Sequence, residues 1–318
     1  MLARAAADRG EQEPPGKDAN TASACRRNGE AAQAGELTGA AQWRLTTGRP
    51  IGSSAIGPPR VSFRSPLVPP DHRSPPLSKR NGDRPSDALR EITIQRGFTK
   101  NAAGSVLIAA GETVVLCTCS HTDAVPAWLQ HSGHGWLTAE YSMLPGSTPS
   151  RKAREASLGR RDGRSMEIQR LIGRCLRMAV HLKQLPEMSF WIDCDVLSAD
   201  GGTRTLAITG GYVALFDALR KLEEDKRINK WPIASPVAAC SVGIVDGEPR
   251  LDLCAAEDNR AEVDMNVAMT GAGGFVEVQS SSERATLNRE QFDAMLDLAE
   301  RGCRQLLDLQ EEALRSDA

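Results

Sequence analysis

Five consecutive residues, Asp200-Gly201-Gly202-Thr203-Arg204, connect an apolar run to a helical pattern and have the chemistry of an anion site. A glycine-rich connection at a helix start leaves the first amide N–H groups without intrahelical partners and free to bind an anion. Thr203 adds a hydroxyl and Arg204 a forked cation, and both suit phosphate. The spacing is neither a Walker loop nor the three-glycine dinucleotide fingerprint. Spacing alone therefore favours the alternative, a plain tight turn with a helix cap.

A cluster of basic residues precedes the first long helical pattern. Its members are Arg151, Lys152, Arg154, Arg160, Arg161 and Arg164. The stretch 148–163 is polar and has no apolar period, which is typical of an exposed loop. On charge alone two interpretations stay open: a solvated surface, or contacts to the phosphate backbone of a nucleic acid.

A group of acidic residues lies at the start of a late alternating run. Glu257 and Asp258 are followed by Asp264, which shares one face of the run 263–269 with Asn266. Two carboxylates close together at a strand end can hold a hard cation such as Mg²⁺ or transfer a proton. Taken alone, the pattern favours a solvated acidic loop.

Together, the three groups supply the parts of a phosphoryl-transfer site: an anion cradle, a nucleic-acid contact and a cation site. The five histidines show no catalytic arrangement, and no Ser-His-Asp grouping has a supporting motif. The eight cysteines are scattered along the chain. The closest pair, Cys117 and Cys119, alternates in a strand-like run. This favours core packing over metal binding and a reduced, cytoplasmic protein.

These groups need elements to position them, and residues 84–315 are patterned throughout. Strands are expected at 91–98, 105–109, 113–121, 135–144 and 188–197, and hairpin turns at 111–112, 246–247 and 271–274. Helices are expected over 165–182, from the glycine loop to about residue 224, and from near Asn288, where Gln291 completes a capping box. Clusters of strands interrupted by helices predict an α+β domain with helices packed on mixed sheets.

The N-terminal quarter of the chain has a different composition. Residues 1–78 hold ten of the eighteen prolines and no sustained apolar period, so they cannot bury enough apolar area to offset their chain entropy. We interpret residues 1–80 as a disordered extension or as the product of a start codon assigned too far upstream. Over the whole chain, the net charge of −2 excludes a polybasic protein, and no apolar stretch is long enough to span a membrane.

Motifs in the patterned part of the chain resemble those of the ribonuclease PH family in amino-acid sequence, order and spacing. They are 99–100 (TK) with 104–107 (GSVL), 135–141 (GWLTAEY), 143–145 (MLP), 164–172 (RSMEIQRLI), 193–197 (DCDVL), 199–205 (ADGGTRT), 257–258 (ED) and 263–266 (VDMN). The resemblance covers 84–315 and implies the ribosomal-protein-S5-domain-2-like α+β fold. It also implies a homohexamer built as a trimer of dimers.

The resemblance implies an activity as well. Members are phosphate-dependent 3′→5′ exoribonucleases, or tRNA nucleotidyltransferases, that trim tRNA 3′ ends, release nucleoside diphosphates and add nucleotides in reverse. The resemblance implies that inorganic phosphate is the co-substrate and that the enzyme uses Mg²⁺. It implies that the RNA substrates are tRNA precursors and other RNA 3′ ends, such as those of rRNA. The family's site residues are expected here for phosphate binding at Arg164, Gly202, Thr203 and Arg204, for catalysis and Mg²⁺ binding at Asp258 and Asp264, and for RNA binding at Arg151 and Arg154.

The chain departs from the family pattern at several positions. Gly146 replaces an arginine after Met-Leu-Pro, Leu206-Ala207 replaces Ala-Ser, Cys254-Ala255 replaces an acid and a tyrosine, and 280–282 is Ser-Ser-Ser in place of Gly-Thr-Ala. None of these removes an expected catalytic position, so activity is expected with weaker RNA binding. Two alternatives remain: an inactive RNA-binding ring subunit, and a hydrolytic exoribonuclease that uses water in place of phosphate.

Overall fold

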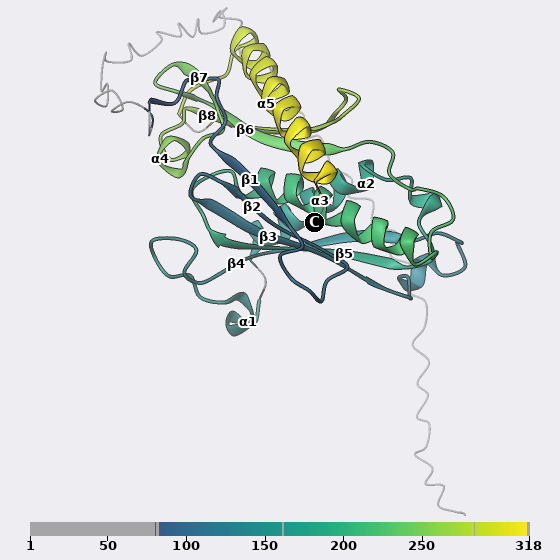
Figure 1. Cartoon of the computed structure of the whole chain (residues 1–318). Coiled ribbons are helices and arrows are strands. Elements are labelled where there is room, and N and C mark those ends of the chain that lie inside the picture. Colours follow the sequence, from purple (N-terminus) through teal and green to yellow (C-terminus); the bar gives the residue numbers. More distant parts are fainter. Residues whose placement is uncertain (1–79, 81–82, 161, 283, 317–318) are drawn as a thin grey trace, which may run out of the picture. The chain divides into compact units, whose positions relative to one another are not determined.

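The computed structural model describes residues 80, 83–160, 162–282 and 284–316 (Figure 1). Of the extension expected at residues 1–80, only Arg80 is among the described residues, and the basic residue Arg161 also lies outside them. Within the described part of the chain, each helix is too short or too polar to traverse a lipid bilayer.

The first sheet contains five strands in the order β1-β2-β3-β5-β4. They are β1 (Ile92–Arg96), β2 (Gly104–Ala110), β3 (Thr113–Thr122), β4 (Trp136–Met143) and β5 (Ser189–Ser198). Neighbouring strands are antiparallel except β4 and β5, which run parallel and so end at the same edge. All five strands form where the alternation of apolar residues predicts them, and Cys117 and Cys119 are fully buried core residues of β3 as expected.

Two long helices, α2 (Gly163–Met178) and α3 (Thr203–Glu224), pack on this sheet. α3 is buried around most of its surface because it also packs against the second sheet. Gly210 permits the close approach of α3 to β2, since a Cβ atom there would lie 2.6 Å from Cγ2 of Ile108.

The end of α2 differs from the prediction. The apolar period continues to Leu182, but the helix ends at Met178 and Leu182 begins a short 3-10 turn, Leu182–Gln184. Val180 instead forms a β-bridge with Ile233, which the helical pattern could not indicate.

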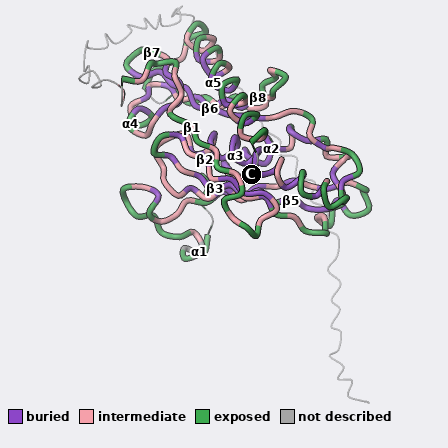
Figure 2. Tube along the Cα trace, in the orientation of Figure 1, coloured by how far each residue is buried: buried purple, intermediate pink, exposed green. Residues whose placement is uncertain are grey.

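The second sheet has four antiparallel strands in the order β7-β6-β8-β9. They are β6 (Val237–Val245), β7 (Glu248–Leu251), β8 (Val263–Thr270) and β9 (Phe275–Ser282). Every residue of β6 is buried, because α3 packs on the strand from one side and α5 (Arg289–Arg315) from the other. This sandwich explains why the sequence of β6 is apolar at every position but Ser241 and Gly243. Figure 2 shows the buried residues gathered along these layers.

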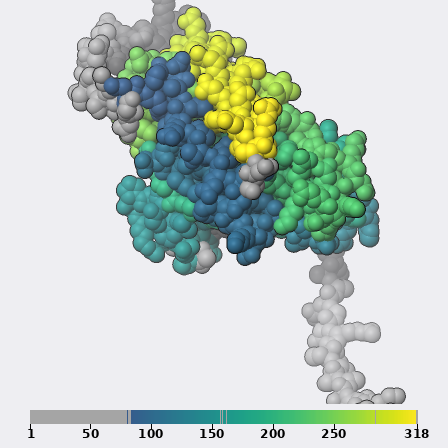
Figure 3. Space-filling model, viewed as in Figure 1, coloured from purple at the N-terminus to yellow at the C-terminus, as the bar shows by residue number. Residues whose placement is uncertain are grey.

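The last helix begins as its capping residues predict. The Asn288 side chain accepts a hydrogen bond from the Gln291 amide at 2.8 Å, and the Gln291 side chain accepts one from the Asn288 amide at 3.1 Å. At its other end, α5 contacts β1 through Arg96, whose Nη1 donates to the carbonyl oxygen of Ala313 at 3.1 Å. The space-filling view shows this helix, in yellow, against the dark blue segment that carries β1 (Figure 3).

Candidate active site

A polar groove of about 700 Å³ gathers the expected phosphate-binding and catalytic residues. Those that line it are Arg164, Gly202, Thr203, Arg204, Asp258 and Asp264. They come from the N-termini of α2 and α3, from the short helix α4 (Ala255–Asp258) and from the start of β8. Three groups that are separate in the sequence therefore face one cavity.

The start of α3 forms the side of the groove that is expected to bind an anion, named here the anion side. Gly201 and Gly202 both have left-handed backbone angles, with φ of +79° and +66°, and a Cβ atom on Gly201 would lie 2.4 Å from the Leu253 carbonyl oxygen. Only glycine fits there without strain. Residues 201–204 line the groove, and the first amide groups of α3 have no acceptor within the helix. The structure confirms the tight turn at the helix start, and anion binding by the loop stays a prediction.

The hydroxyl of Thr203 has a protein partner inside the fold. Its Oγ1 lies 2.8 Å from the hydroxyl of Tyr141 on β4, and both residues are buried. Burial raises the pKa of Tyr141, although the bond to Thr203 acts in the opposite direction. Tyr141 thus ties the first residue of α3 to the parallel edge of the first sheet.

Two arginines give the anion side its charge. Arg164 is the second residue of α2 and is exposed, and its amide donates to the capping carboxylate of Asp162. Arg204 is largely buried, and its Nη1 lies 2.9 Å from Oε1 of Gln279 and 3.4 Å from Oε2 of Glu167. The Arg204 guanidinium is therefore held between α3, α2 and β9 at one wall of the groove.

The groove is also lined by oxygen-bearing side chains. Asp258 ends α4, and Asp264 is the second residue of β8, with Asn266 on the same face as predicted. Ser241 and Asn259 line the same groove. Carboxylate, amide and hydroxyl oxygens are the ligand types of hard cations.

Glu257 belongs to the protein interior rather than to the groove. Its Oε1 lies 2.6 Å from Nε of Arg80 and 3.5 Å from Nη1 of Arg250. Burial would raise the pKa of Glu257, but the bond from Arg80 and that from the Cys254 amide lower it below its ordinary value. The acidic pair in the sequence thus divides into one buried structural residue and one groove residue, Asp258.

The basic cluster lies partly in the groove and partly beside it. Lys152 and Arg164 line the cavity, whereas Arg151 and Arg154 are exposed on the loop that leads to the short helix α1 (Glu155–Leu158). Arg154 is close enough to Asp195 on β5 to oppose the rise that burial causes in the pKa of that carboxyl. The two arginines expected to bind RNA therefore flank the groove.

Sequence reasoning missed Arg284, which also lines the groove. It follows β9, and its Nη2 donates to the carbonyl oxygen of Asn259 at 2.8 Å. A lone arginine in a polar loop shows no pattern that would single it out. Leu206 and Ala207, where the chain departs from the family pattern, are both buried in the core.

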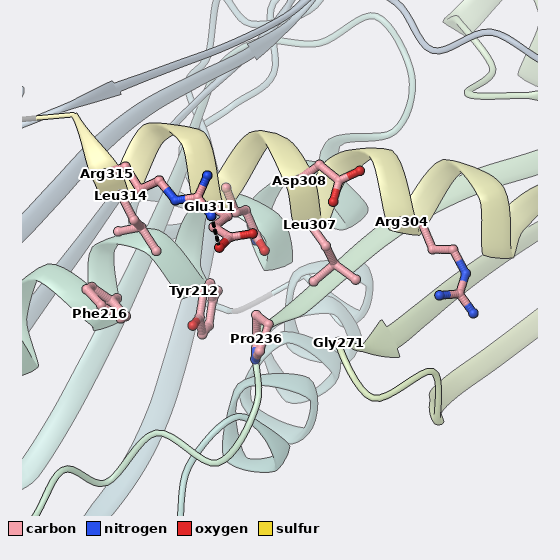
Figure 4. A pocket seen from close by; sticks show the side chains of 11 residues that line it. Tyr212, Phe216, Pro236, Gly271, Arg304, Leu307, Asp308, Glu311, Leu314 and Arg315 are labelled. Carbon is pink, nitrogen blue, oxygen red and sulfur yellow. Dashed lines mark hydrogen bonds and ion pairs between the residues drawn. The ribbon is translucent and has the colours of Figure 1, made fainter.

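A second cavity, of about 680 Å³, lies between α3 and α5. Figure 4 shows its apolar wall of Tyr212, Phe216, Pro236 and Leu314, with Arg304 and other charged side chains of α5 at its rim. It holds none of the residues that the sequence predicts for a site, so the polar groove is the candidate active site.

Comparison with known proteins agrees with this fold and groove. Residues 88–221 match the family model described as "3′ exoribonuclease family, domain 1", and residues 235–302 match "domain 2" of the same family. The chain therefore belongs to the 3′ exoribonuclease family.

Within that family, similar curated proteins are named ribonuclease PH. The protein of Corynebacterium efficiens is 56% identical over 231 residues, which cover 73% of this chain and 94% of the relative. That of Corynebacterium kroppenstedtii is 54% identical over 228 residues, covering 72% of this chain and 90% of the relative. These values confirm the resemblance seen in the motifs.

Solved structures share the fold at low sequence identity. Rice (Oryza sativa) Rrp46 has a TM-score of 0.60 at 17% identity. The match covers 74% of this chain and 100% of the Rrp46 chain. A chain of the Archaeoglobus fulgidus exosome with RNA bound to the active site has a TM-score of 0.61 at 20% identity. The match covers 74% of this chain and 93% of the exosome chain. The predicted ribosomal-protein-S5-domain-2-like α+β fold is confirmed.

Proposed function

We propose that the polar groove is where this chain performs its phosphorolytic 3′→5′ exoribonuclease reaction. The activity itself follows from membership of the family and from relatives more than half identical. What carries the assignment of the site is one observation: six residues, expected on independent motifs to bind phosphate or catalyse, line a single cavity. Inorganic phosphate is the co-substrate of this reaction.

Phosphate occupies the anion side in this proposal. The first amides of α3 and the guanidinium groups of Arg204 and Arg164 bind it, because oriented N–H groups and forked cations suit its oxygens. One phosphate oxygen attacks the phosphorus of the last phosphodiester in line, and the bond from phosphorus to the 3′ oxygen of the preceding nucleotide breaks. The 3′ oxygen takes the proton from phosphate, and a nucleoside diphosphate leaves the shortened RNA.

Asp258 and Asp264 would hold Mg²⁺ in the same groove. Among the described residues no group of three or more acidic, histidine or cysteine side chains could form a full protein cage. Two carboxylates still fit this ion, which commonly binds one or two carboxylates together with substrate phosphates and water. Bound there, the ion would offset negative charge on the leaving oxygen. The two aspartates supply the charge for it beside the phosphate cradle.

RNA enters over Arg151 and Arg154 in this proposal, and its substrates are tRNA precursors and other RNA 3′ ends, including those of rRNA. The flanking position of both arginines supports contact with the RNA backbone. We also propose a homohexamer, a trimer of dimers, and a cytoplasmic location. The location is supported by the free cysteines, seven in the described residues. Domain limits of 84–315 for the catalytic unit belong to the same proposal.

The two rival functions have less support. An inactive RNA-binding subunit has no need to keep Arg164, Arg204, Asp258 and Asp264 together in one cavity. A hydrolytic nuclease has no need for a second anion site beside the scissile phosphate.

Asp264→Asn tests the site directly. The change removes a charge with little change of shape, so kcat should fall roughly a thousandfold while RNA binding and melting temperature are kept. Asp297→Asn, at an exposed position of α5 outside the groove, is the matched control and should leave kcat unchanged. An active Asp264→Asn protein would show that the groove does not carry the reaction.

A further inference from the structure

Three arginines that the proposed mechanism does not use form a buried ion network beneath the groove. Arg80, Arg84 and Arg90 precede β1, and their carboxylate partners are Asp252, after β7, and Glu257, in α4. The side chains of Arg90 and Asp252 are each only 9% exposed. Burying such charges is costly unless they are well paired, so the arrangement calls for an explanation.

Arg90 makes the most complete set of bonds in this network. Its Nε donates to Oδ2 of Asp252 at 2.9 Å, and its Nη2 donates to Oδ1 at 2.7 Å. The Asp252 carboxylate also accepts from the Arg90 amide at 2.8 Å. This fork-to-fork pairing fixes the plane of the guanidinium. The pKa of Arg90 is lowered by burial but raised further by the bonds to Asp252, so the net shift is upward.

The remaining donors of Arg90 reach the glycine loop. Its Nη1 donates to the carbonyl oxygen of Asp200 at 2.5 Å, and its Nη2 lies 3.4 Å from that of Gly201. A Cβ atom on Gly202 would lie 3.1 Å from the same Nη2. The guanidinium therefore lies directly behind the peptide units that turn the loop into α3.

Thr113, the first residue of β3, joins the same arrangement. Its hydroxyl donates to the Gly201 carbonyl at 2.8 Å and accepts from the Asp200 amide at 3.0 Å. Arg90 Nη1 lies 3.2 Å from that hydroxyl. Arg90 and Thr113 together thus bind both loop carbonyl oxygens, and Thr113 also binds the Asp200 amide.

The loop is tied in turn to the acidic wall. Oδ1 of Asp200 accepts from the amide of Ala255, the first residue of α4, at 3.0 Å. Asp258 is the last residue of that helix. One chain of contacts thus runs from Arg90 through the glycine loop to the helix that carries a groove aspartate.

We infer that Arg90, oriented by Asp252 and assisted by Thr113, is a positioning residue that holds the glycine loop in its anion-binding conformation and in register with α4. The inference rests on the proposed function of the groove. Gly201 and Gly202 can adopt many backbone conformations because they have no Cβ atom. Without these bonds, the loop would therefore sample conformations in which its amides do not converge on phosphate. The network restricts that sampling before phosphate arrives.

The test compares Arg90→Lys and Thr113→Val with the control Arg96→Lys. Lysine keeps one charge for Asp252 but cannot reach both loop carbonyls, and Thr113→Val removes only the hydroxyl. Each variant should raise the KM for inorganic phosphate about tenfold, the effect of one lost charge-assisted bond. The KM for RNA should stay within about twofold of the wild-type value, because the defect is confined to the loop that binds phosphate in this proposal.

Arg96 is a matched control because it forms a largely buried pair with Asp217, at 2.7 Å, that makes no contact with the loop. Arg96→Lys should lower the melting temperature without changing the KM for phosphate. If Arg90→Lys fails to fold, Thr113→Val tests the inference on its own, because it leaves the charges of Arg90 and Asp252 paired. A folded Thr113→Val or Arg90→Lys protein with an unchanged KM for phosphate would overturn the inference.

Arg204→Ala separates this failure from failure of the proposed site. If Arg204→Ala raises the KM for phosphate and the positioning variants do not, the groove binds phosphate without help from Arg90. If Arg204→Ala also leaves that KM unchanged, the groove is not the phosphate site and the inference fails with it.

Discussion

The guanidinium of Arg204 and the carboxylate of Glu167 form an ion pair that joins α3 to α2, with Nη1 and Oε2 3.4 Å apart. Glu167 is 41% exposed on its side chain, whereas Arg204 is 15% exposed and lines the groove. In the proposed site, a phosphate on Arg204 would meet a carboxylate that shares the same cation. Competition of this kind weakens anion binding and is relieved when the carboxylate is neutralised.

Glu167→Gln should accordingly lower the KM for inorganic phosphate by about two- to fivefold, the range of a partly exposed ion pair. Steady-state kinetics with phosphate as the varied substrate measures this. Glu223→Gln, in the exposed pair with Arg220 on the same helix α3, should change nothing. A higher KM for phosphate in Glu167→Gln would mean that the carboxylate orients Arg204 rather than competing for it.

Arg151→Ala and Arg154→Ala should act on RNA rather than on phosphate. Both residues lie on the loop beside the groove, so each change should raise the KM for tRNA and reduce the salt dependence of binding by about one unit of slope per lost contact. The KM for inorganic phosphate should be unaffected. Weaker phosphate binding with intact RNA binding would reverse the roles assigned to these residues.

Removal of residues 1–78 should leave folding, assembly and activity intact. Their proline content and lack of an apolar period motivate this prediction, and a chain beginning at Lys79 keeps Arg80 and its bond to Glu257. A chain beginning at Leu89 loses Arg80 and Arg84 and should melt about 10 °C lower, because a buried carboxylate loses two partners. Thermal denaturation of the three chains measures both effects. Equal destabilisation of the two shortened chains would contradict the prediction.

Asp193→Asn should raise the melting temperature at pH 7. Burial, with Glu140 and Asp195 nearby, raises the pKa of Asp193 above its ordinary value of 3.8. The folded state then binds the proton more tightly, so stability falls as pH rises from the unfolded pKa through the folded one, and the penalty persists at pH 7. The gain should disappear below about pH 3.8, where both states are protonated.

Asp217→Asn is the opposite case, because Asp217 is paired with Arg96. That change should lower the melting temperature at pH 7. A destabilised Asp193→Asn protein at pH 7 would show that the Asp193 charge is compensated in the folded state.

Periodic elements could be predicted from the sequence because their signals are local. The strands of the first sheet and the capping box at Asn288 form as expected. The short helix α4 was not expected, since four residues cannot display a helical period. It is defined instead by its cap, where the Glu257 side chain accepts from the amide of Cys254.

The candidate site was predictable as separate parts but not as an assembly. The glycine loop and the pair Asp258 and Asp264 carry spacing signals, and the family resemblance joins them. The network of Arg90 and Asp252 spans 162 residues of chain, and no local pattern indicates such a contact. Arg284 was missed for the same reason, because only the fold brings it to Asn259.

The central claim is that this chain cleaves RNA with phosphate, and the products formed with and without phosphate test it most directly. RNA with a 3′ tail is incubated with the protein and Mg²⁺, and the released nucleotides are separated by chromatography. Nucleoside diphosphates should accumulate when inorganic phosphate is present, and almost no nucleotide should be released when phosphate is omitted. Nucleoside monophosphates in phosphate-free buffer would contradict the account and support hydrolysis, and bound but intact RNA under both conditions would support the inactive ring subunit.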